Sequence, residues 1–149
     1  MIRWRHAVIA VLIAWFVILL GHSVWAQIGQ IKNVAGQVSL VRNNVQQPAK
    51  TGDLLEQADV LTTGPNGSVG ITFIDNTRFS AGPNSRIELK QFNFNPTTQE
   101  GDFVTDVRQG TLAIISGQIA KRSPDAMKVR TPTTILGVRG TKFAIKVDE

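Results

Sequence analysis

The side chains that could carry chemistry in this 149-residue chain are carboxylates, together with Arg139. Beyond residue 26 the sequence contains no histidine, cysteine, tryptophan or tyrosine. A Ser-His-Asp triad, a thiolate nucleophile and a His- or Cys-ligated zinc site are therefore excluded from that part of the chain. What remains is acid–base chemistry of the kind that glycosidases perform with two carboxylates. The candidates are Asp53, Glu56, Asp59, Asp75, Glu88, Glu100, Asp102 and Asp106.

The spacing of these carboxylates singles out no catalytic pair. Asp53, Asp75 and Asp102 stand beside Gly or Asn, where Asp commonly accepts a hydrogen bond from its own turn backbone. We therefore favour turn structure over catalysis and predict that the protein is not an enzyme. Glu100, Asp102 and Asp106 are close enough in sequence for a calcium site, but no calcium-loop pattern surrounds them. We predict no metal site and no cofactor.

Arg139, which lies between Val138 and Gly140, has two interpretations. Its guanidinium fork could bind the carboxylate or phosphate of a ligand. Alternatively, it bonds carbonyl groups or a carboxylate across the closing corner of the domain and holds the last strand in register. We favour the structural interpretation. The six phenylalanines beyond residue 26 fall on alternating faces, and we expect them in the core rather than in a stacking platform.

The first 26 residues have the three-part layout of a secretory signal peptide. Arg3 and Arg5 form a basic start, residues 7–20 are an uninterrupted apolar run, and Val24 and Ala26 occupy the positions that a signal peptidase reads. A run of 14 apolar residues is shorter than the roughly 20 that a membrane-spanning helix needs. We expect cleavage after Ala26 and export to the periplasm or cell surface, with a retained membrane anchor as the alternative. The chain has no cysteine that could carry a lipid.

Without this segment the chain is only weakly basic. Two of its 16 Lys and Arg residues lie in the segment and none of its 11 acidic residues do, so residues 27–149 carry a net charge of +3. An excess of this size is typical of a solvated surface, and we predict no nucleic-acid partner. Because no disulfide can form, a continuous apolar core must stabilise the domain.

The elements that position these side chains are short strands separated by Gly, Pro and Asn turns. Apolar and polar residues alternate in segments such as 69–73, 86–90 and 127–130, which is the period of a half-buried β-strand. The apolar run 111–115 is short enough for a strand buried on both faces. No segment keeps a helical period beyond about two turns. The sequence predicts an all-β domain over residues 27–149, either a compact sandwich or a short β-helix-like solenoid.

Residues that tolerate positive φ predict where the chain turns. Asn43-Asn44 is a plausible hairpin turn, Asp75-Asn76 a tight corner with positive φ at Asn76, and 64–67 a Gly-Pro-Asn-Gly turn. Segments 61–73 and 129–138 each place a Thr-rich, Pro-containing corner before an apolar run. That similarity favours stacked corners of one kind over unrelated loops.

The closing stretch, Thr131–Val147, reads as two extended runs hinged at Arg139-Gly140. Beyond the hinge, apolar residues alternate with Lys142, Ala144 and Lys146, as in a half-buried strand. An unpaired strand edge needs protection by charge or by Pro, and the two lysines can provide it. A strand edge is also a place where a partner protein can add a strand.

Six short motifs follow one another along the chain. They are Gly52-Asp53; Leu61-Thr62-Thr63-Gly64; Asn66-Gly67-Ser68; Phe73–Thr77, with Asp75, Asn76 and Thr77; Pro83–Ile87; and Thr131-Pro132-Thr133 with Gly137, Val138, Arg139, Gly140 and Thr141. Together they resemble the FecR-domain family, named after the periplasmic part of a ferric-citrate signalling regulator. The resemblance covers roughly Gly36 to Val147, and we expect the motif residues to be structural. The family usually has Gly where Asn76 stands, and Asn serves the same positive-φ role.

The resemblance implies an extracytoplasmic all-β interaction domain without known catalysis. The namesake regulators place a cytoplasmic anti-sigma domain before a membrane helix, whereas only six residues precede the apolar run here, so we expect no direct contact with a sigma factor. We predict a non-catalytic protein-interaction module in envelope signalling or assembly. Its partner is an unidentified envelope protein, and it contacts the membrane only if the signal segment is retained.

The alternative is a small cell-wall glycan-binding protein. Tryptophan and tyrosine are the usual residues that stack on sugars, and the chain beyond residue 26 has neither. This composition argues against the glycan alternative.

Overall fold

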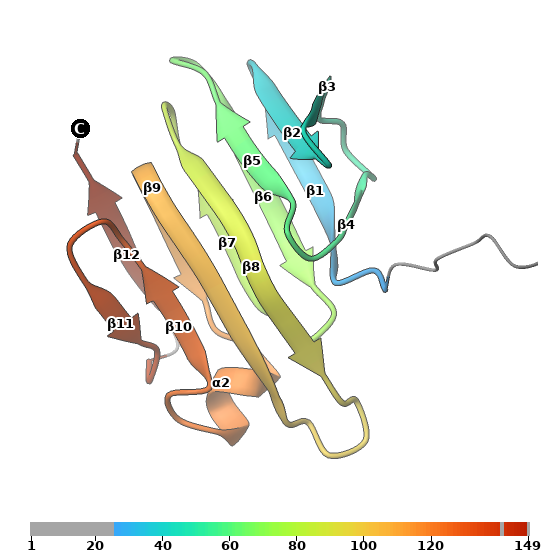
Figure 1. Ribbon diagram of the computed structural model, residues 1–149, viewed down its shortest axis with the longest axis vertical. Coiled ribbons are helices and arrows are strands. Elements are labelled where there is room, and N and C mark those ends of the chain that lie inside the picture. The colour runs from blue at the N-terminus through green and yellow to red at the C-terminus, as the bar shows by residue number, and fades with distance from the viewer. Residues whose placement is uncertain (1–25, 141, 149) are drawn as a thin grey trace, which may run out of the picture.

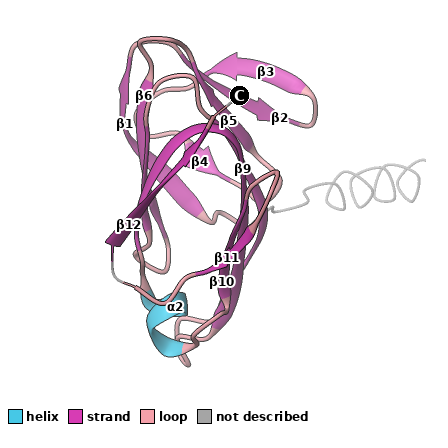
Figure 2. Cartoon of the chain, turned by 90° about the vertical axis from the view of Figure 1, so that its left-hand side faces the viewer, coloured by secondary structure: helices cyan, strands magenta, loops and turns pink. Residues whose placement is uncertain are grey.

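The computed structural model describes residues 26–140 and 142–148, which form a two-layered β sandwich (Figures 1 and 2). All but Ala26 of the predicted signal segment lies outside these residues, as does Thr141. Layer A contains β1 (Gly29–Ala35), β4 (Leu54–Leu55), β6 (Ser68–Phe73), β7 (Arg78–Ala81) and β12 (Lys142–Val147). Layer B contains β2 (Val38–Arg42), β3 (Val45–Pro48), β5 (Val60–Thr63), β8 (Arg86–Phe94), β10 (Met127–Arg130) and β11 (Ile135–Gly137).

The long strand β9 (Gly101–Ile115) belongs to both layers. Its first part pairs with β8 and β10 in layer B, and its last part pairs with β7 and β12 in layer A. The order is β4-β1-β6-β7-β9-β12 in layer A and β3-β2-β5-β8-β9-β10-β11 in layer B. Within the described residues the one helix is the short α2 (Gln118–Arg122), so the all-β prediction is confirmed. No helix there has the length and apolarity needed to cross a bilayer.

Four corners carry the chain from one layer to the other at the same end of the sandwich. They lie at Gly36-Gln37 between β1 and β2, at 64–67 between β5 and β6, at 82–85 between β7 and β8, and at Gly110 inside β9. Gly36 and Gly110 have φ values of +62° and +90°, in the region that glycine adopts without strain. The strands on either side of each corner therefore face one another across the core.

Backbone hydrogen bonds join the corners into a row. Gly64 N–H donates to the carbonyl of Gln37 at 2.8 Å, and Asn84 N–H donates to the carbonyl of Gly64 at 3.1 Å. Gly82 N–H donates to the carbonyl of Thr111 at 3.0 Å, which connects the third corner to the bend in β9. The predicted stacking of corners is found here, although the similarity of segments 61–73 and 129–138 is not structural, because the second segment forms a hairpin within layer B.

Side chains from both layers fill the space between them. Four phenylalanines meet at the end of the sandwich away from the corners, with ring centroids 4.7 to 5.8 Å apart. Phe73 and Phe79 come from layer A and Phe92 and Phe103 from layer B, so the aromatic contacts hold the layers together. These four residues lie in the core as predicted.

Helix α2 closes the end opposite the corners. The buried carboxylate of Asp75 accepts hydrogen bonds from the N–H of Thr77 at 2.9 Å, the hydroxyl of Thr77 at 2.8 Å and the N–H of Ile119 at 3.4 Å. The Thr77 hydroxyl in turn accepts from the N–H of Gly117 at 3.0 Å. The turn between β6 and β7, with Asn76 at φ +66° as predicted, thus fixes the start of the helix.

One local prediction was wrong. Residues 111–115 are not buried on both faces, because Thr111, Ala113 and Ile115 point outward from layer A while Leu112 and Ile114 point inward. The strands paired with β9 set which of its residues face the core, and a short window of sequence does not contain that information.

Candidate functional site

One lateral edge of the sandwich is open. Among the described strands, β12 pairs with β9 alone and β11 pairs with β10 alone, so layer A ends in β12 and layer B ends in the β10–β11 hairpin. The other lateral edge ends in the shorter strands β4 and β3, and β3 carries Pro48. Figure 2 shows the open edge face on, with β12 in front of one layer and β10 and β11 in front of the other. A strand of six residues with one free side is the most extended unpaired backbone in the described structure.

The ladder between β12 and β9 determines which backbone groups face outward. Gly82 N–H bonds the carbonyl of Thr111 on the β7 side of β9. Because bonding direction alternates along an antiparallel ladder, residues 112 and 114 of β9 bond toward β12. They lie opposite the inward-facing, apolar residues of β12. The backbone N–H and C=O groups of Lys142, Ala144 and Lys146 therefore point to the free side.

A groove separates β12 from the β10–β11 hairpin. It has a volume of about 370 Å³ and is lined by Ile145 and Val147 on one side and by Leu136 and the turn 131–134 on the other. Leu136, in the lining of this groove, is 38% exposed, which is high for a side chain of this size. The groove therefore exposes apolar surface beside an unpaired strand.

The hairpin turn that borders the groove is held by its own threonines. Thr131 N–H donates to the carbonyl of Thr134 at 2.8 Å, and Thr134 N–H donates to the hydroxyl of Thr131 at 3.1 Å. Pro132 and Thr133 form the exposed tip. Three residues of the family motifs, Thr131, Pro132 and Thr133, thus lie at the candidate site.

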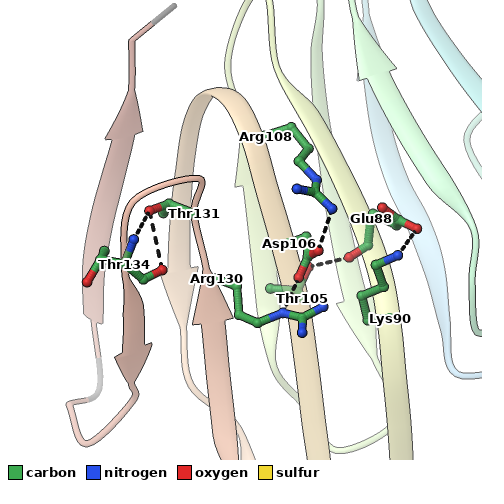
Figure 3. Close-up of polar contacts among 8 residues, drawn as sticks. All are labelled: Glu88, Lys90, Thr105, Asp106, Arg108, Arg130, Thr131 and Thr134. Atoms are coloured by element: carbon green, nitrogen blue, oxygen red, sulfur yellow. Dashed lines mark hydrogen bonds and ion pairs between the residues drawn. The ribbon is translucent and has the colours of Figure 1, made fainter.

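A charged cluster lies on the outer face of layer B next to this turn (Figure 3). The carboxylate of Asp106 is 4% exposed and accepts from Arg130 Nε at 2.6 Å and from an Arg108 guanidinium nitrogen at 3.0 Å. The bond to Asp106 raises the pKa of Arg130 above its ordinary value. Lys90 pairs with Glu88 on the adjacent strand. The cluster and the turn border a shallow groove of about 700 Å³, in which the acidic groups already have basic partners.

Arg139 binds a carboxylate of the chain itself. Its Nε and a terminal nitrogen donate to the two oxygens of Asp125 at 3.1 and 2.7 Å, and both side chains are more than half exposed. This bond raises the pKa of Arg139 and lowers that of Asp125. Gly137 leaves room for Asp125, since a Cβ there would lie 2.8 Å from its Oδ1. Val138 is buried and bonds the carbonyl of Met127, whereas a Cβ at Gly140 would meet no neighbour.

The remaining motif residues lie away from the open edge. Asn66, Gly67 and Ser68 form the corner between β5 and β6, and Asp75, Asn76 and Thr77 form the turn that fixes α2. Gly52 has φ +98°, and Asp53 accepts a hydrogen bond from Lys50 N–H at 2.8 Å in the loop before β4. The structure does not bring these groups to one site.

The carboxylates considered for catalysis or calcium are dispersed, apart from two pairs. Glu88 and Asp106 lie opposite each other in the β8–β9 ladder, where each has a basic partner. Glu56 and Asp59 meet at Arg42, which donates twice to Asp59, at 2.8 and 2.7 Å, and once to Glu56, at 2.8 Å. Asp102 lies in β9 and not in a turn, so the expected turn bond was wrong there. Asp102 and Asp106 are separated by about 13 Å along the strand. Within residues 26–140 and 142–148 no three His, Cys, Asp or Glu side chains gather as metal ligands would.

Sequence reasoning missed Arg42, Arg108 and Arg130. Each is an ordinary outward residue of an alternating strand. Arg130 reaches Asp106 through the β9–β10 ladder, and Arg42 reaches acids of the loop between β4 and β5, whereas Arg108 lies two residues from Asp106 on the same strand. The alternation of charge along β8, β9 and β10 was the one available signal. It indicates an exposed face but not which charges pair.

Comparison with known proteins gives one family and one solved structure. Residues 59–149 match the family model described as "FecR protein". This range begins later than the resemblance read from the motifs, and it leaves Gly52 and Asp53 outside. A solved structure titled "Cell surface anchoring domain" is 33% identical, with a TM-score of 0.40, over 42% of this chain and 84% of its own. No curated protein shows a significant match.

Proposed function

Because this chain belongs to the FecR protein family, we propose that it is a non-catalytic protein-interaction module of the cell envelope. Membership of this family fits a module of the envelope or cell surface. The module binds one envelope protein by accepting a strand of that protein at the free side of β12. It acts in the periplasm or at the cell surface, in signalling or assembly, and contacts neither nucleic acid nor a sigma factor.

The observation that carries this proposal is the unpaired side of β12. Three of its residues, Lys142, Ala144 and Lys146, direct backbone donors and acceptors away from the sandwich. Exposed backbone groups of this kind pair readily with another chain, and main-chain hydrogen bonds supply the affinity in strand addition. The groove beside β12, which Leu136, Ile145 and Val147 help to line, gives the added strand a surface on which to bury side chains.

The test is photocrosslinking in the native envelope. A photoreactive amino acid replaces Ala144 on β12 in the full chain, and the matched control carries it at Gln46, an exposed residue of the edge strand β3. After irradiation, adducts are separated by mass and identified by mass spectrometry. We expect one dominant protein adduct from position 144 and none of that mass from position 46.

Two results would contradict the proposal. Equal adducts from both positions would show that the open edge has no special role. Recovery of muropeptides in place of a protein at position 144 would instead support the glycan-binding alternative. The N-terminus of the crosslinked chain, read in the same spectra, reports whether Ala26 is the cleavage site.

A further inference from the structure

The charges on the two layers differ in a way that specifies what can bind to β12. Every charged residue on the strands of layer A, counting β9 from Gly110 onward, is basic: Lys32, Arg78, Lys142 and Lys146. In layer B the strands carry acids as well, and Glu88 and Asp106 are each paired with a basic side chain. The strands of layer A therefore lack acidic side chains of their own, and the acid that pairs with Lys146 lies just beyond β12.

Two of these basic residues lie on β12 itself. Lys142 and Lys146 point outward on the same face, four residues apart, with Ala144 between them. Lys146 pairs with Asp148 at 2.9 Å, but both side chains are more than 70% exposed, and such pairs are weak and exchange easily. Ile115 on β9 lies opposite both Lys142 and Arg78, so the positive charge continues across the layer.

The inner side of β12 favours apolar side chains in a strand that is added beside it. Ile145 is 9% exposed, and Val147 and Phe143 are partly buried against the core. A strand added to the free side would direct alternate side chains inward beside these residues and into the groove that Leu136 borders. The groove is at the small end of the roughly 300–1,000 Å³ range of ligand pockets, which suits a few side chains better than a large ligand.

A second copy of this chain is the less favourable occupant. Antiparallel pairing of two β12 strands over their full length, centred on Ala144, would place Lys142 of one copy opposite Lys146 of the other. Like charges directly opposite each other across a ladder are destabilising. The basic strand therefore favours a different chain with the opposite charge.

We propose that β12 selects an acidic partner strand with the pattern acid, apolar, any residue, apolar, acid. The two acids lie opposite Lys142 and Lys146 on the outer face, and the two apolar residues face the groove beside Ile145. The pairing is antiparallel, so that Lys142, Ala144 and Lys146 each exchange two backbone hydrogen bonds with the residue opposite them. This inference rests on the proposed function, because it names the chemistry of the strand that the module accepts.

The probe is a labelled synthetic peptide, acetyl-Thr-Glu-Val-Thr-Val-Glu-Thr-amide, titrated against the full chain by fluorescence anisotropy. Three comparison peptides carry Gln for both Glu, Lys for both Glu, or N-methyl groups on the two Glu and the central Thr. Two protein variants are used, the double variant Lys142→Glu with Lys146→Glu, and Lys128→Glu as the matched control. Lys128 is an exposed strand lysine on the outer face of layer B.

We expect the acidic peptide to bind about two- to thirtyfold more tightly than the Gln peptide, because two opposite-charge cross-strand pairs are lost in the latter. The double variant should reverse the preference and bind the Lys peptide better, while Lys128→Glu should bind like the unmodified protein. Raising the salt concentration should weaken binding of the acidic peptide, because exposed pairs are screened.

The peptides separate failure of this inference from failure of the proposed function. If N-methylation abolishes binding but the Glu and Gln peptides bind equally, strand addition stands and the acidic specificity is wrong. If the N-methylated peptide binds as well as the unmodified one, strand addition is also wrong. Absence of binding by any peptide, with polygalacturonate bound by the protein and not by the double variant, would overturn the inference in favour of an anionic polysaccharide.

Discussion

The corner end of the sandwich and its open edge both contain glycine and threonine, but these residues make different contacts in the two places. At the corner end, Gly67 and Gly110 sit so close to neighbouring backbone or side chains that a Cβ would lie 2.3 Å from the carbonyl oxygen of Gln37 and 2.2 Å from Ser85 Oγ, respectively. At the open edge, a Cβ at Gly140 would meet nothing within 4 Å. Threonines at the corner end bond across strands, whereas those of the turn 131–134 bond only within their own hairpin.

This difference distinguishes the region that stabilises the fold from the region that is available for binding. The corner end joins its loops to one another by backbone hydrogen bonds. The open edge packs the inner side of β12 against the core, but it also presents unpaired backbone groups and exposed apolar side chains. Substitutions should therefore reduce stability at the corner end and binding at the open edge.

The largest effect on stability is expected from Gly110→Ala. The positive φ of +90° strains any other residue, and the added Cβ overlaps Ser85. Left-handed strain and overpacking each cost about 1–3 kcal/mol, so we expect the free energy of unfolding to fall by about 2–6 kcal/mol. Denaturant titration measures this change. The matched variant at the open edge, Gly140→Ala, should change the free energy of unfolding by less than about 0.5 kcal/mol. Equal losses in the two variants would contradict the difference between the corner end and the open edge.

The next largest effect is expected from Thr63→Val. The Thr63 hydroxyl accepts from Ser85 N–H at 2.9 Å and donates to the carbonyl of Gly82 at 2.6 Å, and Ser85 is buried. Removal of the hydroxyl leaves the Ser85 N–H and the Gly82 carbonyl without this hydrogen-bond partner, which lowers the free energy of unfolding by about 1–3 kcal/mol. Thermal unfolding measures the Tm of Thr63→Val and of the control Thr133→Val. Thr133 lies in the exposed tip of the hairpin, and we expect no measurable change in Tm for its variant.

A smaller effect is expected from Asp125→Asn at the open edge. The hydrogen bond from Arg139 holds the folded-state pKa of Asp125 below 3.8, so the ion pair stabilises the fold above that pH and stops doing so as the pH falls through the lowered pKa. The Tm of the variant should lie slightly below that of the unmodified protein near neutral pH. The two Tm values should converge in acid. A difference that grows on acidification would show that the pair does not act this way.

The smallest effect on stability is expected from the double variant Lys142→Ala with Lys146→Ala. Both side chains are exposed, so the Tm should hardly change. Without the repulsion between lysines, however, the free side of β12 can pair with a second copy. Sedimentation at increasing concentration should show more self-association than for the unmodified protein. Identical sedimentation would mean that the lysines do not protect this edge.

Much of the fold could be predicted from local sequence patterns. The alternation of residues 69–73 and the turn at Asn76 correctly specified a strand and a positive φ, because both depend on near neighbours. The bend of β9 at Gly110 could not be predicted in this way. One continuous strand serves two layers only because of which strands lie on each side of it, and those come from distant parts of the chain.

The candidate site was predictable only in outline. The alternation of β12 and the position of its lysines indicated an edge strand, but the side left unpaired depends on the register with β9. The ion pair of Arg139 with Asp125 was anticipated only as a contact with an unnamed carboxylate. The pairing of Asp106 with Arg130 gave no local signal, since the two residues meet through a parallel ladder, whereas the spacing of Asp106 and Arg108 on one face of a strand was a local signal that was not used.

The most direct test of strand addition at β12 is residue-resolved amide hydrogen exchange of the full chain, free and bound to its crosslinked envelope partner. In the free protein, the amides of Lys142, Ala144 and Lys146 should exchange quickly, while those of Phe143 and Ile145 are protected by β9. In the complex, all five should be protected. If the partner binds and the amides of Lys142, Ala144 and Lys146 still exchange at the rate of the free protein, the partner does not pair with β12, and strand addition at this edge is wrong.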